Sequence, residues 1–407
     1  MNNWKSVWHY QMIGFGTNFG KIGRLRQHLM ILSSVRADRL RLKLDNRTNL
    51  GQMKIESIRA GVSMDHLSRV TVEGADGAVL EPDEIRWTDE TAIDPVLPGQ
   101  ALHIVIDFES LEGVRAFVQT TSNRTWNSEF MWLDQQANQP ENQPEDQQAN
   151  QPSAEPSAKW MDFSGVLPPM AGPNKPTAAF GISQADLWTD ESVRTIVLFG
   201  DSITHMSFYY DALFDRLLKA YPGKFVLENA GIGGNRLCYD ASKAPNMGEN
   251  YIIIGPAGYG RYPDDVFSDF KPDAVIILEG VNDVTHCWQF DLMDEIPTTA
   301  LFCGRLAEIA AYTHEKGSKV FYATICPESA FAEFDWYDSS EKLRTGINDW
   351  IRKQNQADGW FDFDLAVRNP KCPSRMKPEC NFGDGLHPGA EGGRAMAASV
   401  DLCALMA

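Results

Sequence analysis

From residue 193 onward the sequence alternates short apolar segments with longer amphipathic ones, and this rhythm limits the folds open to the chain. The apolar segments have the length of strands and lie at residues 195–199, 225–230, 273–279 and 319–325. Helical spacing, or a helix-ending residue such as Gly317, marks residues 208–221, 301–316 and 389–406. Strands that alternate with helices predict a parallel sheet covered by helices on both faces, with ligands bound beyond the carboxyl ends of its strands.

The first half of the chain has a different pattern, in which short strand-like segments are separated by turn residues. Leu40, Leu42 and Leu44 alternate with charged residues, which is the period of a half-buried strand. Residues 53–58 and 104–108 are further strand candidates, and no long helical stripe precedes residue 200. The pattern predicts an N-terminal antiparallel β-sandwich over residues 1–190, followed by an α/β domain over residues 191–407.

Residues 135–158 interrupt the first domain with a stretch rich in Gln, Asn, Pro and Glu. Its segment 135–140 recurs identically at residues 147–152, and the stretch has no aromatic or β-branched residue. Such a segment cannot bury enough apolar surface to offset its chain entropy, so it is predicted to be a disordered loop within the first domain. The linker between the domains is expected at residues 168–176 or in the stretch that ends at residue 192.

Composition and charge exclude several classes of function. The 407-residue chain is 43% hydrophobic and 23% charged, as in a soluble globular protein, and its formal net charge is −18. This charge argues against nucleic acid and anionic membranes as partners. We expect a cytoplasmic location, because the N-terminus lacks a signal-peptide core and no apolar run approaches the roughly 18 residues of a membrane span. Seven cysteines favour reduced thiols, although a bridge between Cys372 and Cys380 stays open.

Polar, glycine-containing turns follow three of the predicted strands, at the edge where a parallel sheet would gather a site. They lie at residues 200–202, 229–235 and 280–283, and a fourth polar segment, residues 384–388, precedes the last predicted helix. Ser202 supplies a nucleophilic hydroxyl, His387 a base for its proton, and Asp384 a carboxylate that would orient the base. Glycine amides and the carboxamide of Asn282 supply donors for an oxyanion, each worth about 3 kcal/mol in the transition state.

Taken together, and in this order, these segments resemble the four blocks of the SGNH (GDSL-type) hydrolases. The blocks are Gly200-Asp201-Ser202-Ile203, Gly234, Gly280-Val281-Asn282-Asp283 and Asp384-Gly385-Leu386-His387. The resemblance covers residues 193–407 and implies a flavodoxin-like α/β domain with a catalytic triad of Ser202, Asp384 and His387. It also implies an oxyanion hole made of the Ser202 N–H, the Gly234 N–H and the Asn282 side chain, with Gly231 or Gly233 as alternatives to Gly234.

The whole chain is similar to two-domain SGNH esterases with an N-terminal, jelly-roll-like β-sandwich, many of which act on acylated carbohydrates. This looser match rests on residues 39–46 and 362–364. One departure is His205, where the family more often has a small or acidic residue; together with His286 it is a candidate for lining the pocket. The sequence has no Gly-x-Ser-x-Gly, which argues against the α/β-hydrolase fold.

Simpler interpretations of the same residues stay open. Ser202 could cap a helix N-terminus, Asp384 and His387 could form an ordinary surface pair, and Asn282 could be a turn residue. Asp201 and Asp283 are expected to hold their turns by local hydrogen bonds rather than to take part in catalysis.

The expected function is a serine esterase that removes short acyl groups, acetyl foremost, from a carbohydrate alcohol through an acyl-enzyme, without a metal or organic cofactor. Its partner would be an acyl ester of a small molecule or oligosaccharide. The alternatives are a lipase, thioesterase, lysophospholipase or acyltransferase that uses the same residues, and a non-catalytic carbohydrate-binding protein. The N-terminal domain would either bind glycan or form a wall of the active site. The sugar, the ester position and the oligomeric state are not predicted.

Overall fold

The computed structural model describes the chain except for residues 16–20, 111, 134–176, 243–251 and 270. The predicted disordered loop at residues 135–158 and the proposed linker at 168–176 lie outside the described residues. No helix in the described part of the chain is long and apolar enough to cross a lipid bilayer.

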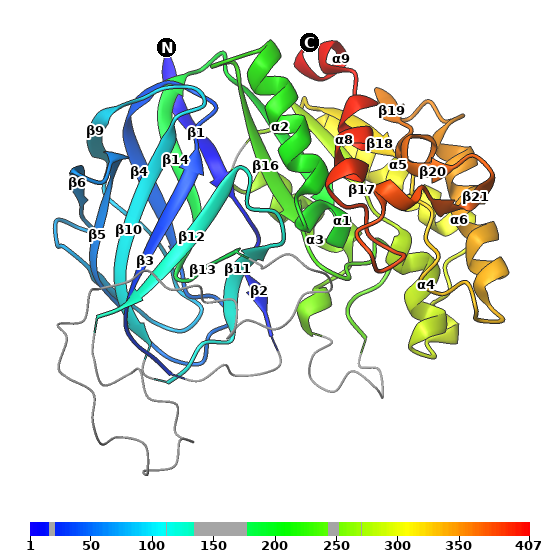
Figure 1. Cartoon of the computed structure of the whole chain (residues 1–407), viewed down its shortest axis with the longest axis horizontal. Helices are drawn as coiled ribbons and strands as arrows, with labels where there is room; N and C mark the ends of the chain where they lie inside the picture. Colours follow the sequence, from blue (N-terminus) through cyan, green and yellow to red (C-terminus); the bar gives the residue numbers. More distant parts are fainter. Residues whose placement is uncertain (16–20, 111, 134–176, 243–251, 270) are drawn as a thin grey trace, which may run out of the picture.

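Antiparallel sheets form the N-terminal part of the molecule, as predicted (Figure 1). One sheet has the order β1-β14-β4-β8 with β9 on β4, a second has β12-β3-β10-β5-β6 with β7 on β5, and a third has β13-β11-β2. The strands are β1 Asn2–His9, β2 Ile13–Gly14, β3 Ile22–Leu32, β4 Ala37–Asp45, β5 Met53–Ser63, β6 His66–Val70, β7 Ala78–Leu80, β8 Ile85–Trp87, β9 Thr91–Val96, β10 Ala101–Ser110, β11 Ala116–Thr120, β12 Trp126–Trp132, β13 Thr177–Ala179 and β14 Ile182–Asp190.

Alternation along the strands explains this arrangement. In β4, Leu40, Leu42 and Leu44 are completely buried, whereas Arg41 and Arg39 remain accessible. Leucines of β4 and apolar residues of β3 and β10 belong to one hydrophobic core, so two of the sheets bury their apolar faces together. The predicted strand at residues 40–45 is therefore confirmed, and it begins three residues earlier than predicted, at Ala37. Its predicted half-buried pattern is wrong beyond Leu42, because Lys43 and Asp45 are also buried, in ion pairs with Asp269 and Arg47.

A parallel sheet with the strand order β16-β15-β17-β18-β19 forms the centre of the C-terminal part. This is the flavodoxin-like order, in which the first strand lies between the second and the third. Its strands are β15 Arg194–Gly200, β16 Phe225–Gly231, β17 Ala274–Leu278, β18 Lys319–Ala323 and β19 Gly359–Phe361, and a separate hairpin joins β20 Arg368–Asn369 to β21 Cys372–Met376. All five residues of β17 are buried, as expected of a strand covered on both faces.

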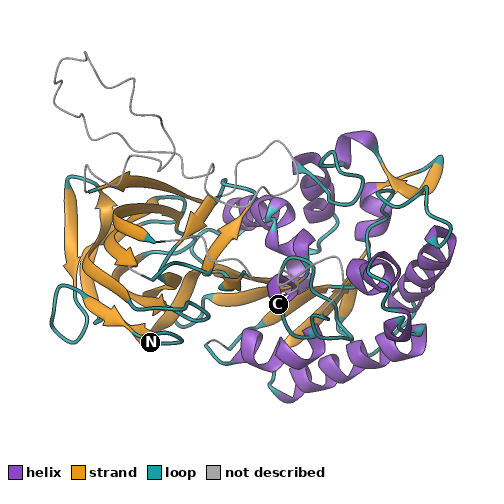
Figure 2. Cartoon of the chain, turned by 90° about the horizontal axis from the view of Figure 1, so that it is seen from below, coloured by secondary structure: helices purple, strands orange, loops and turns teal. Residues whose placement is uncertain are grey.

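Helices cover this sheet, and Figure 2 shows them gathered on the side of the molecule away from the antiparallel strands. Helix α2 packs with α8, while α5 packs with α3 and α6. The helices are α1 Ser202–His205, α2 Phe208–Ala220, α3 Gly258–Phe267, α4 Val281–Gln289, α5 Thr299–Glu315, α6 Tyr337–Ile351, α7 Phe363–Val367, α8 Ala390–Ala398 and α9 Leu402–Met406, with short 3₁₀ turns at η5 Met293–Glu295 and η6 Pro378–Cys380.

The single final helix predicted over residues 389–406 is wrong, because the structure breaks it into α8 and α9. Asp401 lies in an extended conformation between them and accepts hydrogen bonds from the amides of Cys403 and Ala404. Arg216 of α2 donates to the carbonyl oxygens of Ala397 and Val400 at the end of α8. An N-cap aspartate and a bound carbonyl end are both typical of a helix boundary.

The two parts of the chain share an extensive contact. Strand β1 lies against β16, where the Ser6 hydroxyl donates to the buried Glu228 carboxyl at 3.0 Å. The core of the N-terminal sheets also includes Val193 and Val226, which follow residue 190 in the sequence. A division of the chain at residue 190 remains a prediction.

Gly280, between β17 and α4, tests how closely the C-terminal sheet packs against its helices. Its φ is +126°, and a Cβ atom there would lie 2.6 Å from Ile325 Cδ1 and 2.8 Å from Phe302 Cζ. We expect Gly280→Ala to lower the free energy of unfolding by roughly 2–5 kcal/mol, because backbone strain and overpacking add. Gly304 of α5 has open space around a Cβ, so Gly304→Ala should stabilise the protein by up to about 1 kcal/mol. Urea unfolding measures both, and equal effects would contradict the packing described.

Candidate active site

Ser202 is the first residue of the short helix α1 and is separated from the end of β15 by one residue, Asp201. The N-cap of α1 is Asp201, whose carboxylate accepts the Ile203 amide at 2.9 Å, so the interpretation of Ser202 as a helix cap is wrong. Close packing fixes this turn, since a Cβ atom at Gly200 would lie 2.3 Å from the Leu278 carbonyl oxygen. The Ser202 hydroxyl is therefore not used as a cap, and Ser202 lies just beyond the carboxyl end of β15.

Three of the predicted residues form one hydrogen-bonded chain. The Ser202 hydroxyl lies 2.8 Å from His387 Nε2, and His387 Nδ1 lies 2.6 Å from an Asp384 carboxylate oxygen. The side chains of His387 and Asp384 are 14% and 21% exposed, so both are partly accessible to solvent. Because an ionised carboxylate only accepts hydrogen bonds, His387 carries its proton on Nδ1 and offers Nε2 as the acceptor for the Ser202 hydroxyl.

Backbone amides hold the turn that carries the histidine. The second Asp384 oxygen accepts the amides of Leu386 and His387, each at 2.9 Å. The Asn381 side-chain oxygen accepts the amides of Gly383 and Gly385. Although burial acts to raise the pKa of Asp384, the hydrogen bonds from His387 and Leu386 hold this pKa at about 2. Asp384 is therefore ionised at every pH at which the protein would work.

The proposed oxyanion donors approach the same edge from neighbouring strands. Asn282, buried in the first turn of α4, uses one hydrogen of Nδ2 to donate to the Asn235 carbonyl oxygen at 2.8 Å, which leaves the second hydrogen. The Gly231 amide donates to Asn229 Oδ1 at 2.9 Å, which disfavours it as an oxyanion donor. Gly234 has φ +76°, and a Cβ there would crowd Ile254 at 3.1 Å, so only glycine fits this turn without strain.

A buried guanidinium, that of Arg261 in α3, joins the strand ends beneath these groups. It donates to the carbonyl oxygens of Gly200 and Ala230, both at 2.9 Å, and to Asn235 Oδ1 at 2.8 Å. It also pairs with the buried carboxyl of Glu279 at 3.2 Å. Since the Asn235 carbonyl oxygen in turn accepts from Asn282, Arg261 links the strand that precedes Ser202 to the candidate oxyanion donor.

Sequence reasoning missed Arg261 and Asn235. No helix was predicted around Arg261, an arginine is ordinarily a solvent-exposed residue, and the partners of this one lie far from it in the sequence. The one available signal was the position of Asn235 at the end of the glycine-rich turn at residues 229–235.

The carboxyls of Asp201 and Asp283 support the site without reaching its surface. Asp283 accepts the amides of Leu237 and Cys238 at 2.7 and 2.9 Å, and burial raises its pKa to about 6. Burial also raises the pKa of Asp201 to about 7, against the opposing effect of the Ile203 amide. Both residues hold turns, as predicted from the sequence.

The two histidines proposed to line the pocket have different environments. His205 is 3% exposed and its Nε2 donates to the Gln119 carbonyl oxygen at 2.6 Å, so it lies in the contact with the N-terminal strands. His286 is only partly buried, and its ring comes within 3.6 Å of a Cβ built at Gly234. Both histidines lie beside the glycine-rich turn, since a Cβ built at Gly233 would come within 3.5 Å of His205 Nδ1.

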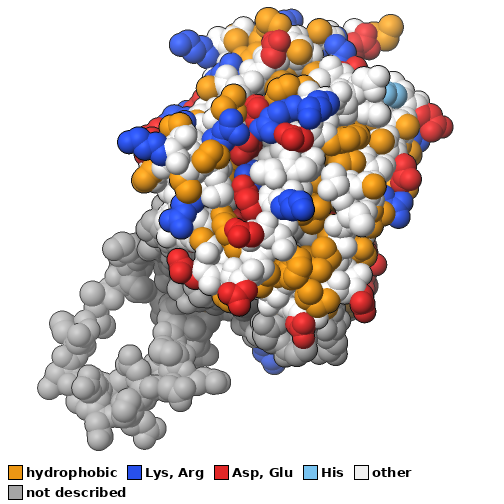
Figure 3. Space-filling model, turned by 90° about the vertical axis from the view of Figure 1, so that its right-hand side faces the viewer, with side chains coloured by type: hydrophobic (Ala, Val, Ile, Leu, Met, Phe, Trp, Pro, Cys, Tyr) orange, Lys and Arg blue, Asp and Glu red, His pale blue; other side chains and the backbone are white. Residues whose placement is uncertain are grey.

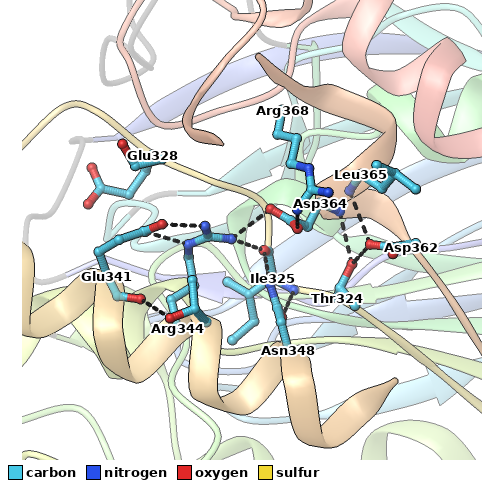
Figure 4. Close-up of polar contacts among 12 residues, drawn as sticks. Thr324, Ile325, Glu328, Glu341, Arg344, Asn348, Asp362, Asp364, Leu365 and Arg368 are labelled. Atoms are coloured by element: carbon cyan, nitrogen blue, oxygen red, sulfur yellow. Dashed lines mark hydrogen bonds and ion pairs between the residues drawn. The ribbon is translucent and has the colours of Figure 1, made fainter. Parts of the chain in front are cut away.

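A charged network braces the loop that follows β18 (Figure 4). Arg344 of α6 donates to the Ile325 carbonyl oxygen at 2.8 Å and to the Asp364 carboxylate at 2.9 Å. Asn348 holds both the amide and the carbonyl oxygen of Ile325. Asp362 and Asp364 belong to the segment 362–364 on which the looser sequence match rests, and they have a structural role in this network. The nearby Cys372 and Cys380 are free thiols, so the alternative of a bridge between them is wrong.

A comparison with known proteins finds a family match in the C-terminal part of the chain. A model of the GDSL-like lipase/acylhydrolase family matches residues 198–395. No curated protein matches the sequence. Similar solved structures include a GDSL-like lipase from Bacteroides thetaiotaomicron (20% identity, 52% of this chain and 87% of that chain, TM-score 0.36). Others are an α/β hydrolase enzyme from the metagenome of Lake Arreo, Spain (20%, 53% and 96%, 0.39), and a variant of an acetyl xylan esterase from Geobacillus stearothermophilus (18%, 53% and 95%, 0.40).

The raised pKa of Asp201 predicts a pH dependence of stability. Between pH values of about 4 and 7 the folded protein keeps a proton that the unfolded chain loses, so ionisation of Asp201 lowers stability as the pH rises through this window. An asparagine in its place cannot ionise but still caps α1. The stability of Asp201→Asn relative to the native protein should therefore rise from pH 4 to pH 8, by up to about 4 kcal/mol.

Unfolding in urea at several pH values measures this difference. Asp89 is the control, because hydrogen bonds from Thr71 and the Gly74 amide lower its pKa, so it is ionised in both the folded and the unfolded state above about pH 5 and Asp89→Asn should show no change in relative stability from there to pH 8. A difference for Asp201→Asn that stays constant with pH would contradict a buried, protonated Asp201.

Proposed function

We propose that this chain, which belongs through its residues 198–395 to the GDSL-like lipase/acylhydrolase family, is a serine esterase that removes short acyl groups, acetyl foremost, from carbohydrate alcohols. Family membership makes it a carboxylic ester hydrolase. The observation that carries the finer proposal is the hydrogen-bonded chain from the Ser202 hydroxyl through His387 to Asp384.

Acylation begins when His387 Nε2 takes the proton of the Ser202 hydroxyl as its oxygen attacks the ester carbonyl. The charge that develops on His387 is stabilised by the ionised Asp384, which also fixes the ring in the reactive tautomer. The carbonyl oxygen becomes an oxyanion, which accepts hydrogen bonds from the Ser202 and Gly234 amides and the remaining N–H of Asn282. His387 then protonates the leaving alcohol, and the acyl group remains on Ser202.

Deacylation repeats these steps with water. His387 Nε2 removes a proton from a water molecule, which attacks the acyl-enzyme carbonyl, and the same donors stabilise the second oxyanion. Collapse returns the proton to Ser202 and releases the carboxylic acid.

Support for a carbohydrate alcohol comes from four aromatic side chains, Trp288, Phe331, Phe334 and Trp336, which we call the aromatic platform. The rings of Trp288 and Trp336 are nearly parallel, at 7° and 6.3 Å between centroids. Phe334 packs on Trp336 at 5.5 Å yet is 55% exposed. Rigid aromatic faces with an exposed edge bind the apolar face of a sugar ring or the face of a planar group.

The aromatic platform is attached to both halves of the candidate site. Trp288 is in α4, the helix that begins with the Asn282 turn. The amides of Ser329 and Ala330, at the start of the loop that bears the phenylalanines, donate to the Gly385 carbonyl oxygen at 2.7 and 3.2 Å. Gly385 belongs to the turn of Asp384 and His387. Hydrophobic side chains gather on the side of the molecule where α4 and α6 lie (Figure 3).

Ser202→Ala should abolish turnover while the fold persists. We expect kcat for p-nitrophenyl acetate to fall by about 10⁴-fold or more, because no nucleophile remains. Ser399→Ala is the matched control, since the Ser399 hydroxyl only donates to the Met396 carbonyl oxygen at the end of α8. Steady-state kinetics measure both variants, and a Ser202→Ala variant with the native kcat would reject Ser202 as the nucleophile.

The aromatic platform should affect sugar esters selectively. The double variant Phe334→Ala and Trp336→Ala should raise KM for a mono-acetylated methyl glucoside by about tenfold, because the sugar ring loses its stacking surface. Vinyl acetate, which has no ring, should be hydrolysed as before. Trp360→Ala, at a 39% exposed tryptophan of β19, is the control. Equal losses on the two substrates would show that the platform is not a sugar-binding surface.

A further inference from the structure

The helix that carries Ser202 is too short to be stable by itself. Helix α1 spans only Ser202–His205, which is one turn, and a single turn gains too few hydrogen bonds to offset the loss of chain entropy. It is followed by Ser207, a non-glycine residue in the left-handed region with φ +67°. Such a conformation persists only where its surroundings impose it.

Residues of the N-terminal strands impose it. The Thr120 hydroxyl, at the end of β11, lies 2.8 Å from the His205 carbonyl oxygen, to which it can donate. His205 Nε2 donates to the Gln119 carbonyl oxygen, and the Ser122 amide donates to the Met206 carbonyl oxygen at 3.1 Å. The end of α1 and the residue after it are thus held by β11 and the loop that follows β11, both in the N-terminal part of the chain.

The buried hydroxyl of Ser207 is the centre of this contact. The Tyr10 hydroxyl lies 3.0 Å from it and the Thr120 hydroxyl lies 2.8 Å from it. The side-chain nitrogen Nδ2 of Asn229 donates to it at 3.1 Å. Asn229 also donates to the Thr204 carbonyl oxygen at 2.9 Å. Tyr10, Thr120, Asn229 and Ser207 are each at most 1% exposed, so water cannot replace these hydrogen bonds if one partner is removed.

We propose that Tyr10 and Thr120 are positioning residues for the nucleophile, and that the N-terminal strands act in the reaction by holding α1 through residues 205–207. This inference rests on the proposed function of Ser202. The connection is short, since the Ser202 carbonyl oxygen accepts the Met206 amide at 2.8 Å within the same turn. Catalytic groups must be held within about 0.5 Å of their productive geometry, so a loosened end of α1 disturbs the alignment of Ser202 with His387.

Thr120→Val tests the proposal, because valine keeps the shape of threonine but removes the hydroxyl. We expect kcat for p-nitrophenyl acetate to fall about tenfold with KM changed less than about twofold, since substrate binding does not involve Thr120. Thr120→Ser, which retains the hydroxyl, should restore most of the native kcat.

A matched control separates positioning from general stability. Thr88 is also buried in the N-terminal part, where its hydroxyl accepts the Leu42 amide at 2.9 Å and donates to the Asp89 carbonyl oxygen at 3.2 Å. Thr88→Val should cost comparable stability in urea unfolding but leave kcat unchanged. If Thr120→Val lowers kcat no more than Thr88→Val does, the positioning role is overturned.

Tyr10→Phe provides a second variant should Thr120→Val fail to fold. The phenyl ring can keep the contacts that Tyr10 makes with Trp8 and Trp126, at 6.0 and 5.3 Å between centroids, while its hydroxyl contact with Ser207 is lost. A fall in kcat at constant KM supports the proposal, and an unchanged kcat contradicts it. Failure of the proposed function is recognised separately, because activity would then survive Ser202→Ala.

Discussion

The buried guanidinium of Arg261 holds together the strand ends on which the candidate active site is built. It binds the Gly200 carbonyl at the end of β15 and the Ala230 carbonyl near the end of β16, and it reaches Asn282 through Asn235. Adjacent loops of a parallel sheet diverge where the strand order reverses, here beside β15, and this divergence opens the crevice in which ligands bind. Divergent loops lack the sheet's own hydrogen bonds, so a multidentate group such as arginine is suited to fix their spacing. The charge of Arg261 is balanced nearby by the Asp265 carboxylate at 2.7 Å, which keeps its burial tolerable. Glu279, whose pKa is raised by burial, accepts a further hydrogen bond from the guanidinium.

The N-terminal strands provide a second support, at the other end of the same short helix. Arg261 fixes Gly200, before Ser202, whereas Thr120 and Tyr10 fix residues 205–207 after it. The two supports come from distant parts of the sequence and leave the Ser202 hydroxyl accessible between them. This arrangement gives the N-terminal part a role beyond that of an attached binding module. The roles expected from the sequence, glycan binding or a wall of the site, are compatible with it.

Prediction from the sequence succeeded where a feature is local. The strand β4, the buried run of β17, and the polar turns at Ser202, Asn282 and His387 follow from residues close together in the chain. Prediction failed where the interacting residues are far apart in the sequence, or where two residues compete for the same structural position. Asp201, one residue earlier, takes the cap position that was open to Ser202, and Asp401 interrupts the final helix. Arg261 and Thr120 could not be found in this way, because their importance comes from carbonyl groups that only the tertiary fold brings to them.

Covalent labelling of the nucleophile tests the central claim most directly. The protein is treated with diisopropyl fluorophosphate, and the adduct is located by intact mass measurement and peptide mapping. We expect one label per chain, on Ser202, and a much slower reaction in His387→Ala, because the hydroxyl then lacks the base that activates it. A label on another residue, or continued ester hydrolysis by a fully labelled protein, would contradict the assignment of Ser202 and His387 as the reacting pair.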